Sequence, residues 1–348
     1  MTRSIWCLQI ACSREMKETT METRVRGECQ SLNNLTDFFL TPTNHTFRDF
    51  SSAFGNDVAK SIYKTLYNPT YSKKSFKQIF PVKIFTDKVT KKYVFELSDN
   101  RQIETVVIKR RTGNTICLST QVGCPVQCRF CKSGENGLIR NLSTSEIIQQ
   151  FLFVNEKINR IVFMGIGEPL YNYNELIRAI HILRDRNGLD FPTDGISIST
   201  VGPIEKLQML REEHIKVQLV LSLHATDQET RDYLIPGMST YSINEVIALT
   251  MNYGRRHNRK VTIAYLLLPG INDRKADSER LSRWFGNKNV AINLLKYNGK
   301  RTHEFRPASA QEFNHFKDHL EQNNVQVTLR QSMGESIEAA CGELVIKQ

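Results

Sequence analysis

The sequence predicts an α/β fold built on a parallel sheet, because strands and helices alternate regularly from residue 115 onward. Short runs rich in β-branched residues predict six strands, at 115–120, 160–165, 195–200, 216–223, 260–268 and 290–297. Amphipathic stretches between them predict helices near 143–157, 173–186, 203–213, 243–257 and 276–286. Strands joined through helices pair in parallel with right-handed crossovers, which gives either an open sheet or part of a barrel.

The segments on either side of this series complete the domain organisation. Strands at 92–97 and 103–109, joined by the turn Ser98-Asp99-Asn100, precede it, and a helix near 309–322 and a strand at 326–330 follow it. Residues 1–30 show no clear period, so we expect a disordered extension. Residues 31–85 are expected to form a small N-terminal helical/β accessory module, and residues 86–348 the catalytic core.

The composition indicates a polyanionic partner and no membrane segment. The chain has 47 Lys and Arg against 36 Asp and Glu, which gives a net charge of +11 and a pI near 9.2. Such an excess suits RNA as a partner, although a merely basic surface is the plain alternative. The apolar stretch 4–12 is too short to span a membrane, and charged residues follow it at once. We therefore expect a cytoplasmic protein, and we expect it to be a monomer.

Three cysteines stand close together in Q-V-G-C-P-V-Q-C-R-F-C, at Cys124, Cys128 and Cys131. A disulfide with one spare thiol is one interpretation, and a structural zinc site with a fourth ligand from elsewhere is another. The interpretation we favour is an iron–sulfur cluster, because its irons take cysteine thiolates as ligands. Three cysteines leave one iron of a [4Fe–4S] cubane open to a substrate or cofactor.

Polar motifs follow the predicted strands, which favours a partial (β/α)6, TIM-like barrel over a plain open sheet. In a parallel barrel the chemistry gathers on the loops at the C-terminal ends of the strands. The three cysteines follow the first strand, and further motif residues end or follow four others: Gly167, Glu168, Ser199, Ser222, Leu223, His224 and Asn298. Singly these are weak signals, since Gly-Glu-Pro is often a turn and a lone histidine is often a capped core residue. Together they predict a cofactor site.

These motifs resemble those of radical S-adenosylmethionine enzymes, and more narrowly the RlmN/Cfr family, which methylates adenine C2 or C8 in RNA. The resemblance covers roughly residues 90–346. It is carried by I-E-T-V (103–106), C-L-S-T-Q-V-G-C-P-V-Q-C-R-F-C (117–131), G-L-I-R-N-L (137–142), F-M-G-I-G-E-P-L (163–170), S-L-H-A (222–225), L-P-G-I-N-D (268–273) and A-A-C-G-E-L (339–344). The A-A-C-G stretch is the most discriminating, because most radical S-adenosylmethionine enzymes lack a C-terminal cysteine.

The resemblance implies a set of cofactors and partners. The fold would be the partial barrel of radical S-adenosylmethionine enzymes, with a [4Fe–4S] cluster on Cys124, Cys128 and Cys131 and two S-adenosylmethionine molecules per turnover. Gly167, Glu168, Ser199, Ser222, Leu223, His224 and Asn298 would contact S-adenosylmethionine. The substrate would be RNA, with ribosomal RNA of the large subunit first, transfer RNA second and C2 favoured over C8. Residues 31–85 would help to grip it, and a donor such as flavodoxin would supply electrons.

The resemblance also implies three catalytic residues. Cys341 would accept a methyl group by displacement, and a 5′-deoxyadenosyl radical would then activate that methyl for addition to the base. Cys117 would release the product by forming a disulfide with Cys341, so we expect that disulfide in a resting structure. Glu104 would accept the ring proton. The plain alternatives are a buried small hydrophobe at Cys341 and a solvent-facing strand carboxylate at Glu104.

Two other functional classes stay open from the sequence. One is a radical S-adenosylmethionine enzyme that acts on a protein or small molecule, and the other is a non-catalytic RNA-binding protein with a degenerate cluster. The tail before Cys341 departs from the family pattern, because S-M-G-E-S-I (332–337) stands where T-R-G-x-D-I is usual. The motifs that carry the chemistry thus match the family, whereas the tail before the cysteine differs from it.

Overall fold

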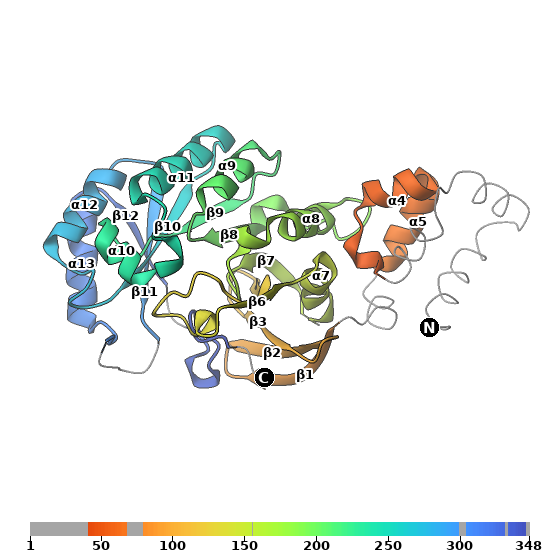
Figure 1. Ribbon diagram of the computed structural model, residues 1–348, viewed down its shortest axis with the longest axis horizontal. Coiled ribbons are helices and arrows are strands. Elements are labelled where there is room, and N and C mark those ends of the chain that lie inside the picture. The colour runs from red at the N-terminus through yellow and green to blue at the C-terminus, as the bar shows by residue number, and fades with distance from the viewer. Residues whose placement is uncertain (1–40, 68–78, 155, 299–303, 331–332, 346–348) are drawn as a thin grey trace, which may run out of the picture. The chain divides into compact units, whose positions relative to one another are not determined.

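The computed structural model describes residues 41–67, 79–154, 156–298, 304–330 and 333–345 (Figure 1). The chain divides into two compact units. The larger unit comprises residues 81–141, 156–173 and 193–348, and the smaller comprises residues 1–80, 142–155 and 174–192. The expected extension at 1–30 lies outside the described residues.

One ten-stranded sheet dominates the structure, with the strand order β1-β2-β3-β4-β7-β8-β9-β10-β11-β12. Its strands are β1 (Ile79–Thr86), β2 (Thr90–Leu97), β3 (Gln102–Ile108), β4 (Asn114–Leu118), β7 (Ile158–Phe163), β8 (Ile196–Thr200), β9 (Gln218–Ser222), β10 (Val261–Leu267), β11 (Val290–Lys296) and β12 (Gln326–Arg330). β2, β3 and β4 pair antiparallel, and every neighbouring pair from β4 to β12 is parallel.

This topology confirms the α/β prediction. The parallel strands follow the chain order, and the sheet ends at β1 and β12 without closing, which is the arrangement of a partial barrel. The six predicted strands correspond to β4, β7, β8, β9, β10 and β11, and the predicted strand at 326–330 joins the same parallel series. β10 is buried along most of its length, as expected for a strand covered on both faces.

The described helices are α4 (Phe47–Phe54), α5 (Asn56–Leu66), α7 (Thr144–Phe153), α8 (Tyr173–Arg184), α9 (Ile204–Glu212), α10 (Gln228–Leu234), α11 (Ile243–His257), α12 (Lys275–Phe285) and α13 (Ala310–Gln322). In the larger unit α11 packs on β9, β10 and α9, while α13 packs on α12 and β12. Several helices begin at a capping box, for example Ser309 with Glu312 at the start of α13. No helix in the described part of the chain combines the length and apolar character that a bilayer crossing requires.

The smaller unit is helical and contains α7 and most of α8 besides α4 and α5. Tyr63 of α5 is fully buried, and its ring contacts Phe47, Phe50 and Tyr67. Asn44 Oδ1 accepts a hydrogen bond from the Ser145 backbone N–H at 2.6 Å, which joins the segment before α4 to the start of α7. The N-terminal module expected at 31–85 therefore shares its unit with helices from later in the chain.

Candidate active site

The loop that carries the three cysteines lies between β5 (Gln121–Gly123) and β6 (Leu138–Asn141), which pair as a small antiparallel sheet. Gly123 has φ +83°, and a side chain there would place Cβ only 2.1 Å from the Gly137 carbonyl oxygen. Glycine is therefore required at the start of the loop. The Cys124 N–H donates to that same oxygen at 3.0 Å, and the Cys131 N–H donates to the Cys128 carbonyl at 3.0 Å. We call residues 124–131 the cysteine loop.

A cavity of about 1300 Å³, measured out to its open mouth, lies at the C-terminal ends of the parallel strands. The cavity brings together most of the residues that the sequence predicted for the cofactor site. Its lining includes Cys124, Cys128, Cys131, Met164, Gly167, Glu168, Ser199, Ser222, His224, Asn298 and Cys341. Leu223, Glu104 and Cys117 do not line it.

Glu168 follows β7 and is almost fully buried against the next loop along the sheet. Its Oε1 accepts hydrogen bonds from Thr200 Oγ1 at 2.6 Å and from the Leu170 N–H at 3.0 Å, and its Oε2 accepts from the Val201 N–H at 2.9 Å. Burial raises the pKa of Glu168 to about 7, against the effect of these hydrogen bonds. A cationic ligand in the cavity would hold this carboxylate ionised.

Gly167 allows this loop to lie close to the cysteine side of the cavity. Its φ is +105°, and an added Cβ would lie 2.6 Å from Cβ of Gln121. Gln121 Oε1 in turn accepts a hydrogen bond from the Glu168 N–H at 2.8 Å. The backbone of the G-I-G-E-P sequence therefore fixes the orientation of the Glu168 carboxylate, so this segment does more than form a turn.

His224 follows β9 with a φ of +55° and is held by neighbouring backbone. Its Nδ1 accepts a hydrogen bond from the Leu266 N–H at 3.0 Å, and the Asn272 side chain donates to the carbonyl oxygens of His224 and Leu266, each at 2.7 Å. Burial lowers the pKa of His224 to about 3, so the ring is neutral and carries its proton on Nε2. His224 is thus a satisfied buried histidine and at the same time part of the cavity wall.

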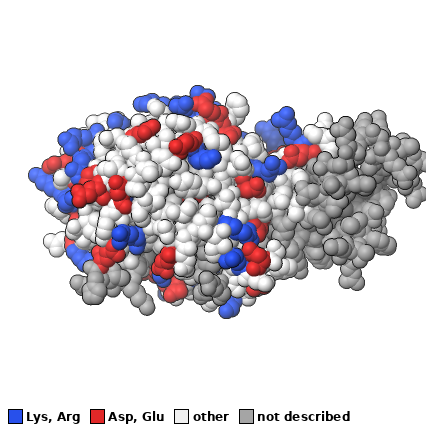
Figure 2. All heavy atoms as spheres, in the orientation of Figure 1, with Lys and Arg blue, Asp and Glu red and all other residues white. Residues whose placement is uncertain are grey.

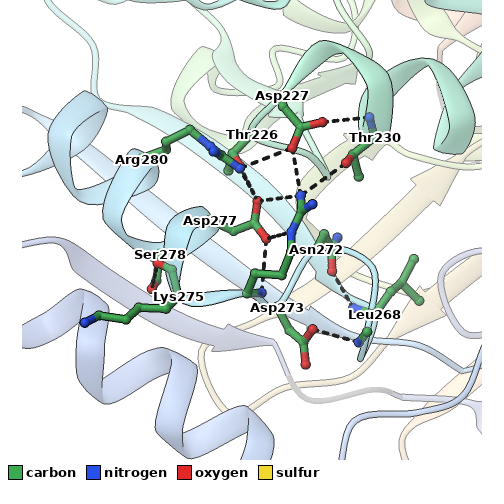
Figure 3. A network of polar contacts seen from close by, with 12 residues as sticks. Thr226, Asp227, Thr230, Leu268, Asn272, Asp273, Lys275, Asp277, Ser278 and Arg280 are labelled. Atoms are coloured by element: carbon green, nitrogen blue, oxygen red, sulfur yellow. Dashed lines mark hydrogen bonds and ion pairs between the residues drawn. The ribbon is translucent and has the colours of Figure 1, made fainter.

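A network of charges behind this wall supports it (Figure 3). Asp277 of α12 is fully buried, and it accepts hydrogen bonds from Arg274 Nε at 2.8 Å and from Arg280 Nη2 at 2.9 Å. Both arginines also reach Asp227, the N-cap of α10, and Asp277 hydrogen-bonds Thr226. The network joins the residues that directly follow the S-L-H-A motif to those that follow the L-P-G-I-N-D motif, and so it supports the histidine loop from behind.

The C-terminal segment 334–345 lies beside the cysteine loop and carries Cys341. The Lys132 N–H donates to the Gly342 carbonyl at 2.9 Å, and Ser133 Oγ donates to the Leu344 carbonyl at 2.8 Å. Asn298 Nδ2 donates to the Cys341 carbonyl at 3.2 Å. Cys341 itself is exposed, so the alternative of a buried small hydrophobe is wrong.

Glu104 and Lys92 form a buried ion pair under the same segment. Both side chains are 2% exposed, with Lys92 Nζ 3.1 Å from Glu104 Oε1. Glu104 Oε2 accepts a hydrogen bond from the Val345 N–H at 3.1 Å, and Lys92 Nζ donates to the Glu338 carbonyl at 3.1 Å. The alternative of a solvent-facing carboxylate at Glu104 is therefore wrong, because β3 is buried along nearly its whole length.

Cys117 lies in β4, where it is buried in an apolar group with Ala339 and Leu344 of the C-terminal segment. The disulfide that we expected between Cys117 and Cys341 is not present in the structure. The reason is their placement: Ala339 packs on Cys117, whereas Cys341, two residues further on, is exposed at the cavity. The segment would have to shift for the two sulfurs to meet.

The cysteine loop fits an iron–sulfur cluster better than a single metal ion. Burial raises the pKa of Cys124 to about 12 and also raises those of Cys128 and Cys131, so the thiols need bound cations to become thiolates. Among the described residues, no three histidine, cysteine or acidic side chains are arranged to hold one metal ion. A cubane puts each thiolate on a different iron and so spreads the sulfurs apart.

Several residues that build the site escaped the sequence analysis, namely Lys92, Arg231, Asn272 and Asp277. Asn272 had a readable signal, because it lies within the L-P-G-I-N-D motif (268–273). Arg231 and Asp277 had none, since each stands among polar residues at the start of a short helical segment.

Comparison with known proteins identifies the family. Residues 118–281 match the family described as the Radical SAM superfamily. A "Probable RNA methyltransferase" from Rhodopseudomonas palustris is 46% identical over 74% of this chain and 72% of its own length. A "Probable dual-specificity RNA methyltransferase RlmN" from Dictyoglomus turgidum is 38% identical over 82% of this chain and 84% of its own length.

A solved structure has the same fold. The crystal structure of a radical SAM methyltransferase from Sphaerobacter thermophilus superposes with a TM-score of 0.82 at 29% identity. The match covers 88% of this chain and 99% of that chain. On these similarities the chain belongs to the RlmN family of RNA methyltransferases within the radical SAM superfamily, with a [4Fe–4S] cluster and S-adenosylmethionine as its cofactors.

Proposed function

We propose that this RNA methyltransferase modifies carbon C2 of adenosine, chiefly in large-subunit ribosomal RNA and secondarily in transfer RNA, and that Cys341 carries the methyl group. The observation that supports this proposal is the place of Cys341, an exposed thiol that lines one cavity with the three cysteines of the cysteine loop. A methyl group on its sulfur would stand within the chamber where the cofactors bind. A non-catalytic RNA-binding protein would have no need of this arrangement.

The chemistry of the target explains why such a carrier is needed. Adenine C2 lies between two ring nitrogens, so it is electron-poor and does not attack a sulfonium methyl group. The Cys341 thiolate is a competent nucleophile, and it would take the methyl group from a first S-adenosylmethionine by displacement. When bound, the cluster with a second S-adenosylmethionine supplies the one-electron chemistry that turns this methyl into a carbon radical.

The remaining lining residues would hold S-adenosylmethionine. Glu168 offers a buried carboxylate with fixed orientation, suited to an ammonium group. Ser199 and Ser222 are hydrogen-bonded to each other at 3.2 Å on neighbouring strands and present hydroxyls to the cavity. Gly167, Leu223, His224 and Asn298 would shape the rest of the site, Leu223 from behind the lining through its backbone.

Release of the product would use Cys117 and Glu104. After addition to the base, the adduct would lose its ring proton and one electron, which the redox cofactors would accept. The Cys117 thiolate would then attack the sulfur of Cys341, so that an S–S bond forms, the C–S bond breaks and the product carbon keeps the electron pair and takes a proton. Glu104 would accept the proton lost from the ring. Both residues contact the C-terminal segment, through Ala339 and through the Val345 N–H, so one displacement of that segment would uncover both.

RNA would bind through basic side chains, since a net charge of +11 favours a polyanion. Lys109, Arg110 and Arg111 are exposed candidates near the end of β3, whereas two further basic stretches of the sequence, 73–77 and 300–301, lie outside the described residues. On the face shown in Figure 2, basic and acidic side chains are interspersed. We further propose that the enzyme is a cytoplasmic monomer, that the module at 31–85 contacts RNA and that a flavodoxin-type protein donates electrons.

The test is anoxic reconstitution followed by mass spectrometry of nucleosides. The loaded enzyme is incubated with ribosomal or transfer RNA and S-adenosylmethionine bearing a deuterated methyl group, with Cys341→Ala as the matched control. We expect labelled 2-methyladenosine from the wild type and none from the variant. Labelled 8-methyladenosine alone would overturn the C2 assignment. Labelled 2-methyladenosine from Cys341→Ala would overturn the carrier role.

A further inference from the structure

A fully buried arginine, Arg231 of α10, stands beside the cysteine loop without an acidic partner. Its side chain is 0% exposed. Within the described part of the chain no carboxylate lies within ion-pair distance of its guanidinium, and its Nε has no hydrogen-bond partner. Burial of an uncompensated cation is costly, because the charge loses its hydration. Such a residue indicates that a negative group belongs nearby.

The hydrogen bonds of Arg231 place it under the cavity wall but leave its charge uncompensated. Nη1 donates to the Leu223 carbonyl at 2.6 Å, and Nη2 donates to the Val201 carbonyl at 2.6 Å. These oxygens lie at the C-terminal ends of β9 and β8, so the guanidinium bridges two strand ends. Carbonyl groups are neutral acceptors, and they solvate the cation without cancelling it.

The helix that carries Arg231 is bonded directly to the cysteine loop. The Arg129 N–H donates to the Leu234 carbonyl at 3.1 Å, and the Gly237 N–H donates to the Val126 carbonyl at 3.0 Å. Leu234 belongs to an apolar group on which Cys124 and Cys128 pack. Burial lowers the pKa of Arg231 to about 10, against the electrostatic effects of Cys128 and, more weakly, of the Asp232 carboxylate, which is not in ion-pair contact with it, so the guanidinium is charged at neutral pH.

We propose that Arg231 is the counter-charge of the iron–sulfur cluster and that it raises the reduction potential of that cluster. The inference rests on the assignment of Cys124, Cys128 and Cys131 as the ligands. An oxidised [4Fe–4S] core has two positive charges against three thiolates, so the loaded loop is net negative, and reduction adds another negative charge. A buried cation favours the more negative state, and net charge is one of the factors that set cluster potentials.

The test is a redox titration of the loaded enzyme without S-adenosylmethionine, followed by electron paramagnetic resonance. Arg231→Gln keeps hydrogen-bond donors but removes the charge, and Arg231→Lys keeps the charge. We expect a midpoint potential shifted to more negative values in Arg231→Gln and close to the wild type in Arg231→Lys, at equal iron and sulfide content. Arg129→Gln is the matched control. Arg129 lies within the cysteine loop itself, but its side chain is 49% exposed, so water screens its charge.

Each outcome of the redox titration either supports or overturns the proposal. A wild-type potential in Arg231→Gln, or an equal shift in Arg129→Gln, would overturn the proposal and leave Arg231 as a structural brace. If Arg231→Gln retains no cluster, Arg231→Lys decides alone: a loaded cluster at the wild-type potential supports the counter-charge. An Arg231→Lys protein that folds by circular dichroism yet holds no cluster would show that hydrogen-bond geometry matters and charge does not. Failure of the wild type to load any cluster would count against the ligand assignment instead.

Discussion

The buried pair of Lys92 and Glu104 offers a sharp test, because Glu104 has both a structural environment and a proposed chemical role. The two charges lie 3.1 Å apart at 2% exposure, and each also bonds to backbone of the C-terminal segment. Glu104→Gln keeps an acceptor for the Val345 N–H but leaves the Lys92 ammonium without its counter-ion. Lys92→Met leaves the Glu104 carboxylate without its counter-ion.

The size of the effect follows from the burial of both partners. Removal of one member of a buried ion pair costs about 3–5 kcal/mol, because the remaining charge is uncompensated. We therefore expect Glu104→Gln to lower the free energy of unfolding by about 3 kcal/mol or more, and Lys92→Met by a similar amount. The double variant removes both charges, so we expect it to recover most of this loss and to lie within about 1 kcal/mol of the wild type, which corresponds to a coupling energy of about 5 kcal/mol.

The assay is urea unfolding of the cluster-free proteins under reducing conditions, followed by circular dichroism. Additive losses in the double variant, or a loss under about 1 kcal/mol in Glu104→Gln, would refute the reasoning from buried charge. The double variant also separates structure from chemistry. If it regains stability but yields no methylated RNA, Glu104 acts on the substrate; if it regains both, its role is structural.

Three further outcomes are expected. Replacement of Cys124, Cys128 and Cys131 together by alanine should abolish iron and sulfide binding after anoxic reconstitution, and unchanged metal content would disprove the ligand assignment. Cys117→Ala should trap RNA covalently on Cys341, visible as a nuclease-sensitive shift on a denaturing gel, whereas free methylated RNA at the wild-type rate would remove Cys117 from the mechanism. RNA affinity should fall steeply with added salt, since phosphate contacts release counterions, and a filter-binding curve independent of salt would contradict the basic surface.

The sequence predicted the parallel sheet well, because its strands are short β-branched runs set off by amphipathic helices. It did not predict β1, which contains Pro81 and is exposed except at its first residue, nor α10, which has only seven residues. It also could not show that α7 and α8 share a compact unit with the N-terminal helices, because that grouping depends on contacts between distant segments.

The residues of the candidate site also fall into a group that the sequence could predict and a group that it could not. Residues at strand ends were predictable, because topology brings the C-terminal ends of parallel strands to one rim. The partners of those residues were not, because burial and pairing are set by the fold. Glu104 illustrates this: on sequence a carboxylate in a strand suggests solvent, yet the structure buries it with Lys92. Arg231 is a second charged residue that the structure buries, in this case a cation.

The hydrogen bonds of the C-terminal segment explain why its sequence can depart from the family pattern without displacing Cys341. Lys132 and Ser133, which directly follow the cysteine loop, donate hydrogen bonds to the carbonyls of Gly342 and Leu344. Asn298 donates to the carbonyl of Cys341. Backbone carbonyls are the same whichever side chain is present. Met333, where an arginine is usual, packs with the apolar group around Cys117 instead of taking part in these bonds. The departures therefore leave in place the backbone hydrogen bonds that position the thiol.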